Sequence, residues 1–74
     1  MLGKVLRDAR LAADLTQEEL AYRAGLDRTY ISLLEHDRKS PTMDVLFRLA
    51  KALGLKASVL IARVERESVG RTET

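Results

Sequence analysis

The sequence has no cysteine, one proline and one histidine, and its only aromatic residues are two tyrosines and one phenylalanine. The absence of cysteine excludes disulfide bonds and thiolate metal sites, and nothing argues for secretion. Proline and aromatic residues are scarce, and no run of alternating β-branched residues occurs. This composition favours a small helical bundle over a sheet protein. No apolar run approaches the roughly 18 residues that cross a bilayer, and no signal peptide is visible. We therefore expect a soluble cytoplasmic protein with no membrane partner.

Residues that carry enzyme chemistry are also scarce. There is one histidine, no cysteine, and no pair of acids set in an apolar pocket for acid–base catalysis. No second histidine stands at metal-ligand spacing, and no glycine-rich phosphate-binding sequence occurs. We predict a protein that is not an enzyme, with no catalytic residue, metal or cofactor. We expect a chain of 74 residues to make one domain, without a separate domain for a small-molecule ligand.

Charge alone does not identify a partner. The formal net charge is +2 with a pI near 9.3, which permits nucleic-acid binding without arguing for it. Between residues 16 and 41 five acidic side chains outnumber four basic ones, which are Arg23, Arg28, Arg38 and Lys39. Any DNA-binding surface must therefore be built from a local selection of cations.

The segment 16–35 is the most informative part of the chain, because it predicts two short helices joined by a tight turn. Thr16 and Glu19 have the spacing of a capping box, which begins the first helix. Gly25 tolerates the left-handed backbone that ends it. Asp27 is a candidate N-cap for a second helix that reaches Glu35. Two helices around a glycine turn, the second with a polar outward face, are typical of helix-turn-helix DNA binding.

The flanking segments predict three further helices. Leu2, Leu6, Ala9 and Ala13 recur at helical spacing over residues 2–13. Residues 36–41 are polar and include the proline, so they predict a loop. Thr42 can cap a helix over residues 43–53, with Gly54 after its end. A fifth helix is predicted from residue 57 to about 66, and the aperiodic polar residues 67–74 predict a flexible tail. The expected fold is all-α, with five helices in one domain over residues 1–66.

Three motifs resemble those of a known family. Residues 16–21 (Thr-Gln-Glu-Glu-Leu-Ala), 24–27 (Ala-Gly-Leu-Asp) and 30–35 (Tyr-Ile-Ser-Leu-Leu-Glu) resemble the phage-repressor/Cro-like (XRE-type) helix-turn-helix family. The likeness continues through residues 40–42 and 49–54. Leu20-Ala21-Tyr22-Arg23 with residues 26–32 resembles, more narrowly, the controller proteins of restriction–modification operons. The resemblance implies a lambda-repressor-like fold, double-stranded DNA as partner and an ion pair between Arg10 and Glu35.

Base-reading residues are expected on the second helix of the motif. Its first turn projects Arg28 and Thr29 toward a major groove, and Leu33 lies one turn further. Arg28 can donate two hydrogen bonds to a guanine, and Thr29 can bond a base edge or contact a thymine methyl group. Leu33 offers only apolar contact. The alternatives are that Arg28 and Thr29 are ordinary helix surface and that Leu33 belongs to the core.

Contacts to the DNA backbone are implied by the resemblance. It assigns them to Gln17, at the start of the first motif helix, and to further candidates, which are Tyr30, Ser32, His36 and Arg38. Lys39 matches a basic loop residue that also reaches bases in controller proteins. The alternatives are a core role for Tyr30 and an ordinary solvated loop for Arg38 and Lys39.

A lone domain of this size reads few base pairs, so we expect a homodimer on a pseudo-palindromic operator. The dimer interface needs apolar residues that the core does not use, and the candidates are Val59, Ile61, Ala62 and Phe47. The alternative is that Phe47 and Ile61 close the core of the monomer. The predicted function is sequence-specific transcription regulation, as a restriction–modification controller or a prophage repressor. The competing function is a protein-interaction or antitoxin-type module with the same fold.

Overall fold

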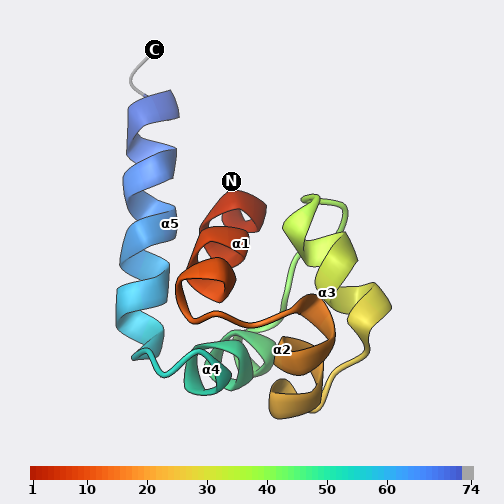
Figure 1. Cartoon of the computed structure of the whole chain (residues 1–74). Helices are drawn as coiled ribbons and strands as arrows, with labels where there is room; N and C mark the ends of the chain where they lie inside the picture. Colours follow the sequence, from red (N-terminus) through yellow and green to blue (C-terminus); the bar gives the residue numbers. More distant parts are fainter. Residues whose placement is uncertain (73–74) are drawn as a thin grey trace.

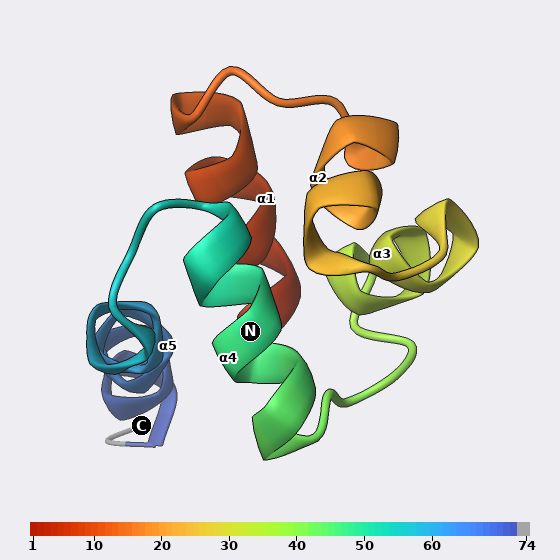
Figure 2. The ribbon, with the colours of Figure 1, turned by 90° about the horizontal axis from the view of Figure 1, so that it is seen from below.

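The computed structural model describes the backbone of residues 1–72 and the side chains of residues 1–68. These residues form five helices and no strand: α1 (Leu2–Ala12), α2 (Gln17–Ala24), α3 (Arg28–Glu35), α4 (Met43–Ala52) and α5 (Ala57–Thr72). Figure 1 shows α1 between α5 and α3. In Figure 2, α4 runs between α5 and the α2–α3 pair. The all-α fold with five helices is the predicted one.

Local signals place the ends of the helices. Thr16 Oγ1 accepts a hydrogen bond from the Glu19 amide at 3.0 Å, while Glu19 Oε1 accepts one from the Thr16 amide at 2.9 Å. This is the predicted capping box. Thr42 caps α4 by accepting from the Val45 amide at 3.2 Å. Asp27 stands at the N-cap position of α3, but its side chain makes no capping hydrogen bond.

The core is aliphatic and joins all five helices. Its fully buried side chains are Leu6, Leu20, Ile31, Leu34, Leu49 and Leu60. The larger group of buried residues connects the four helices α1, α2, α3 and α4. A smaller group, made of Val5, Ala50 and Leu60, attaches α5 to α1 and α4. Ala13 is exposed, contrary to its place on the predicted apolar face, because α1 ends at Ala12 and the chain turns there.

The predicted end of the fifth helix near residue 66 was wrong, because α5 continues to Thr72. Once a helix is nucleated, each further residue adds one backbone hydrogen bond that roughly balances the entropy lost in fixing its backbone, so a helix can extend beyond its apolar face. The added turns make a polar contact beside the start of α1, where Ser68 Oγ donates to Met1 Sδ. Apolar periodicity does not record such contacts. Of the predicted tail, residues 73–74 lie outside the described residues.

Candidate nucleic-acid interface

The turn between α2 and α3 is held from two directions. Gly25 adopts φ 69°, ψ 37°, and the Leu26 amide donates to the Ala21 carbonyl at 2.8 Å, which closes α2. From α4, Arg48 Nε donates to the Ala24 carbonyl at 3.1 Å and Arg48 Nη2 to the Gly25 carbonyl at 2.9 Å. A guanidinium at a helix C-terminus also complements the helix dipole. The turn that sets α3 against α2 is therefore tied to α4.

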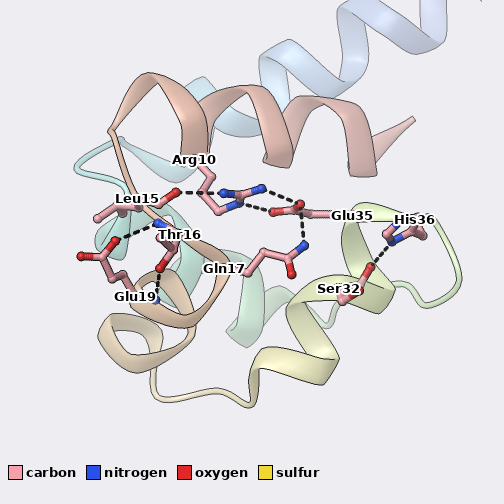
Figure 3. A network of polar contacts seen from close by, with 8 residues as sticks. All are labelled: Arg10, Leu15, Thr16, Gln17, Glu19, Ser32, Glu35 and His36. Carbon is pink, nitrogen blue, oxygen red and sulfur yellow. Dashed lines mark hydrogen bonds and ion pairs between the residues drawn. The ribbon is translucent and has the colours of Figure 1, made fainter.

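Arg10 and Glu35 form the ion pair that the resemblance implied (Figure 3). Arg10 Nε and Nη2 donate to the two Glu35 carboxylate oxygens at 2.6 and 3.1 Å, and Arg10 Nη1 donates to the Leu15 carbonyl at 2.8 Å. The two side chains are 10% and 3% exposed. The hydrogen bonds to Glu35 raise the pKa of Arg10 above its ordinary value, so the guanidinium stays charged although it is buried. The pair ties α1 to the end of α3.

Gln17 joins this network, because its Nε2 donates to Glu35 Oε1 at 3.0 Å (Figure 3). The side chain is half-buried at the first residue of α2. An amide nitrogen carries two hydrogens, so one bond to Glu35 leaves a second donor for an anion at this helix N-terminus. The ion pair thereby orients a side chain that was expected to contact phosphate.

The outer face of α3 presents a small set of polar groups. Arg28 and Thr29 are exposed at its first turn, while Ser32 and Leu33 are half-buried. Leu33 lies outside the group of buried core residues. Tyr30 is half-buried and packs against the main core, which agrees with a core role for its ring.

The residues after α3 are exposed and polar. His36 Nδ1 lies 2.8 Å from the Ser32 carbonyl, which anchors the ring to the last turn of α3 (Figure 3). Arg38 and Lys39 follow in the loop and are exposed. The Arg38 amide donates to the Leu33 carbonyl at 2.9 Å, so the chain leaves α3 in a defined direction. Arg28 and Thr29 thus lie at the start of α3, and the cations Arg38 and Lys39 follow its end.

The candidate interface residues are on the surface. Phe47 is 57% exposed on α4, and Val59 and Ile61 are 37% and 38% exposed on α5. Ala62 is exposed as well. The alternative in which Phe47 and Ile61 close the monomer core is wrong, since neither belongs to the buried groups.

Two contacts of functional interest escaped the sequence analysis. Arg48 holds the motif turn from α4, and Asp37 binds the first turn of α1 from the loop after α3. Asp37 directly follows the capping residue of α3, in a left-handed conformation with φ 56°. Glycine is usual at that position. The aspartate there was therefore the one feature of the sequence that could have pointed to this contact.

Within the described residues no group of three or more histidine, cysteine, aspartate or glutamate side chains is placed to hold a metal ion. No helix in the same part of the chain has the length and apolar character to cross a membrane.

Comparison with known proteins identifies the family of this chain. Residues 6–60 match the family model described as helix-turn-helix. The chain is 34% identical to the HTH-type transcriptional regulator y4dJ of Sinorhizobium fredii, covering 95% of this chain and 91% of y4dJ. It is 34% identical to the control protein C.BamHI of Bacillus amyloliquefaciens, covering 82% of this chain and 76% of C.BamHI. It spans only 44% of two longer regulators of Mycobacterium tuberculosis.

Among solved structures, the restriction–modification controller protein C.AhdI of Aeromonas hydrophila superposes with a TM-score of 0.78 at 36% identity, covering 80% of this chain and 89% of C.AhdI. The buried helical core, the motif turn and these likenesses agree with one another. The chain belongs to the helix-turn-helix family of DNA-binding transcriptional regulators.

Proposed function

We propose that this regulator binds a pseudo-palindromic operator as a homodimer and acts as a restriction–modification controller. One observation carries the DNA-reading part: Arg28 and Thr29 are exposed on the first turn of α3, whose last residue is held by Arg10 of α1. The turn that precedes α3 is held by Arg48 of α4. A fixed helix is what base recognition needs, because an arginine reads a guanine only in a defined bidentate geometry.

The proposed roles divide into base reading and backbone contact. Arg28 and Thr29 read base edges, Leu33 contacts bases through its apolar side chain, and Lys39 reaches bases from the loop. The remaining polar residues contact phosphate, and they are Gln17, Tyr30, Ser32, His36 and Arg38. The Tyr30 ring packs against the core, so its contribution to phosphate binding comes from the hydroxyl group.

Two features support the proposed homodimer: the small size of the base-reading surface and the exposed apolar residues. One α3 covers few base pairs, whereas two copies would read half-sites about 34 Å apart. Val59, Ile61, Ala62 and Phe47 supply apolar surface that the monomer core leaves uncovered. The controller role is supported by the likeness to C.BamHI and C.AhdI, which are named as control and controller proteins.

The test compares two arginines that should act differently. The probes are a duplex selected by the parent protein from a random pool and a random duplex of the same length, titrated at several salt concentrations. Arg28→Ala should lower the preference for the selected duplex by about 5- to 150-fold per half-site, which corresponds to about 1–3 kcal/mol. Arg38→Ala should weaken both duplexes alike and make the salt slope shallower by about one unit for each phosphate that the side chain neutralised.

Arg23→Ala is the control, because Arg23 is an exposed arginine on α2 rather than on the proposed reading helix. It should keep both the preference and the salt slope. If Arg28→Ala retains the parental preference, α3 does not read bases through Arg28. If the parent shows no preference at all, the protein-interaction or antitoxin-type module becomes the better interpretation.

A further inference from the structure

Asp37 occupies a position that ordinarily favours glycine. The Arg38 amide donates to the Leu33 carbonyl at 2.9 Å and the Asp37 amide to the Leu34 carbonyl at 3.1 Å. These two bonds form a Schellman motif, whose left-handed residue is Asp37 with φ 56°. A side chain other than glycine is disfavoured in that conformation, although aspartate tolerates it better than most residues.

The carboxylate of Asp37 binds the first turn of α1. Its Oδ1 accepts from the Gly3 amide at 2.9 Å, and its Oδ2 from the Met1 amino group at 2.7 Å. The Gly3 amide is one of the helix donors that have no partner within α1, and an anion is favoured at that end of the helix dipole. In Figure 1 the start of α1 lies beside the end of α3.

The two helices approach each other so closely that residue 3 must be glycine. A Cβ atom at Gly3 would lie 2.2 Å from the Glu35 carbonyl oxygen, which is backbone and cannot move aside. The Asp37 carboxylate is therefore held against α1 at a fixed place. The next two residues of the chain are Arg38 and Lys39.

Asp14 provides an internal comparison. It is the left-handed residue of the same motif after α1, with φ 60° and with Leu15 donating to the Arg10 carbonyl at 3.1 Å. The Asp14 side chain makes no hydrogen bond or ion pair with the residues that the structure describes. The two aspartates thus share backbone conformation and charge, and they differ in the contact with a second helix.

We propose that Asp37 is a positioning residue for DNA binding: its bond to Gly3 fixes the direction of the loop and so places Arg38 and Lys39 against the DNA. This role rests on the proposed function, in which those two cations contact DNA. It adds a residue that touches neither base nor phosphate.

The direction in which DNA affinity changes distinguishes a positioning role from a purely electrostatic one. A carboxylate next to a DNA-contacting loop repels phosphate, so its removal by itself should tighten binding. A positioning role predicts the opposite for a variant that cannot bond to Gly3. Asp37→Gly removes the charge and the hydrogen bond together, and also relieves the backbone conformation. Asp37→Asn removes the charge but keeps an oxygen that can accept from Gly3.

The experiment titrates Asp37→Gly, Asp37→Asn and Asp14→Gly with the selected duplex at several salt concentrations. We expect Asp37→Gly to bind about three- to tenfold more weakly per half-site, with a salt slope shallower by about one unit per protomer. Asp37→Asn should bind at least as tightly as the parent with the parental slope. Asp14→Gly should also keep the parental slope.

A second measurement needs no DNA. Hydrogen exchange of the Gly3 amide, followed by NMR, should be faster in Asp37→Gly than in Asp37→Asn or the parent, because only the glycine variant removes the acceptor. A Gly3 exchange rate in Asp37→Gly equal to that of the parent would overturn the hydrogen bond, and with it the positioning role.

The outcomes distinguish this role from the proposed function. If the parent prefers the selected duplex and Arg38→Ala flattens the slope, but Asp37→Gly binds as tightly as Asp37→Asn with the parental slope, the positioning role alone is overturned. If the parent binds selected and random duplexes equally, the proposed function fails and the positioning role fails with it.

Discussion

Replacing Glu35 by alanine should strongly destabilise the fold, because Glu35 belongs to a buried ion pair. The Glu35 carboxylate accepts three hydrogen bonds, two from Arg10 and one from Gln17. Without it, Arg10 keeps only the bond from Nη1 to the Leu15 carbonyl. The guanidinium cannot escape the cost by losing its proton, since its pKa is far above neutrality.

The expected loss is large relative to the stability of so small a domain. An uncompensated buried charge costs about 3–5 kcal/mol, and a domain of this length has a free energy of unfolding of about 4–11 kcal/mol. With a urea m-value of about 1 kcal/mol/M, the unfolding midpoint should fall by about 3 M or more. The transition can be followed by circular dichroism at about 222 nm, near a minimum of the α-helical spectrum, because helices are the only regular secondary structure in the described residues.

Two further variants make this prediction discriminating. The double variant Arg10→Met, Glu35→Leu removes both charges and should be more stable than Glu35→Ala by at least about 2 kcal/mol, because no charge is left buried without a partner. Asp8→Ala breaks the exposed Lys4–Asp8 pair, whose side chains are 69% and 61% exposed, and should leave the midpoint near the parental value. A parental midpoint for Glu35→Ala, or a double variant no more stable than it, would refute the argument.

Three other predictions concern the dimer, the motif turn and the capping box. Val59→Asp should give a folded monomer with weakened operator binding in sedimentation experiments; a parent that stays monomeric at about tens of micromolar with a full operator duplex would reject this interface. Arg48→Met should lower the melting temperature and the preference for the selected duplex, because it removes both bonds to the motif turn, whereas Lys51→Met on the same helix should change neither. The hydrogen bond from the Thr16 amide lowers the pKa of Glu19 below its ordinary value of 4.5, so the box stabilises the fold fully above that pH and its contribution is lost as the pH falls through the lowered pKa. Glu19→Gln should therefore reduce the fall in melting temperature between about pH 6 and about pH 3, and an identical fall in both proteins would contradict this.

The sequence by itself determined the helices, the motif and the family. Thr16, Gly25 and Thr42 mark helix ends through bonds to residues a few positions away, so the signals are local and readable. The aliphatic residues of α1 to α4 recur with the helical period because one face of each helix is buried. The end of α5 escaped this reasoning, since its last turns make a polar contact beside α1.

Only the tertiary structure decided how the reading helix is held. Gln17 meets Glu35 across 18 positions, Arg48 meets Ala24 across 24, and Asp37 meets Gly3 across 34. None of these pairs leaves a periodic trace, because each joins two helices whose relative position depends on how the whole core packs. A hydrogen bond needs its donor and acceptor within a few tenths of an ångström of the ideal distance, and a residue pattern specifies which faces are buried but not that distance.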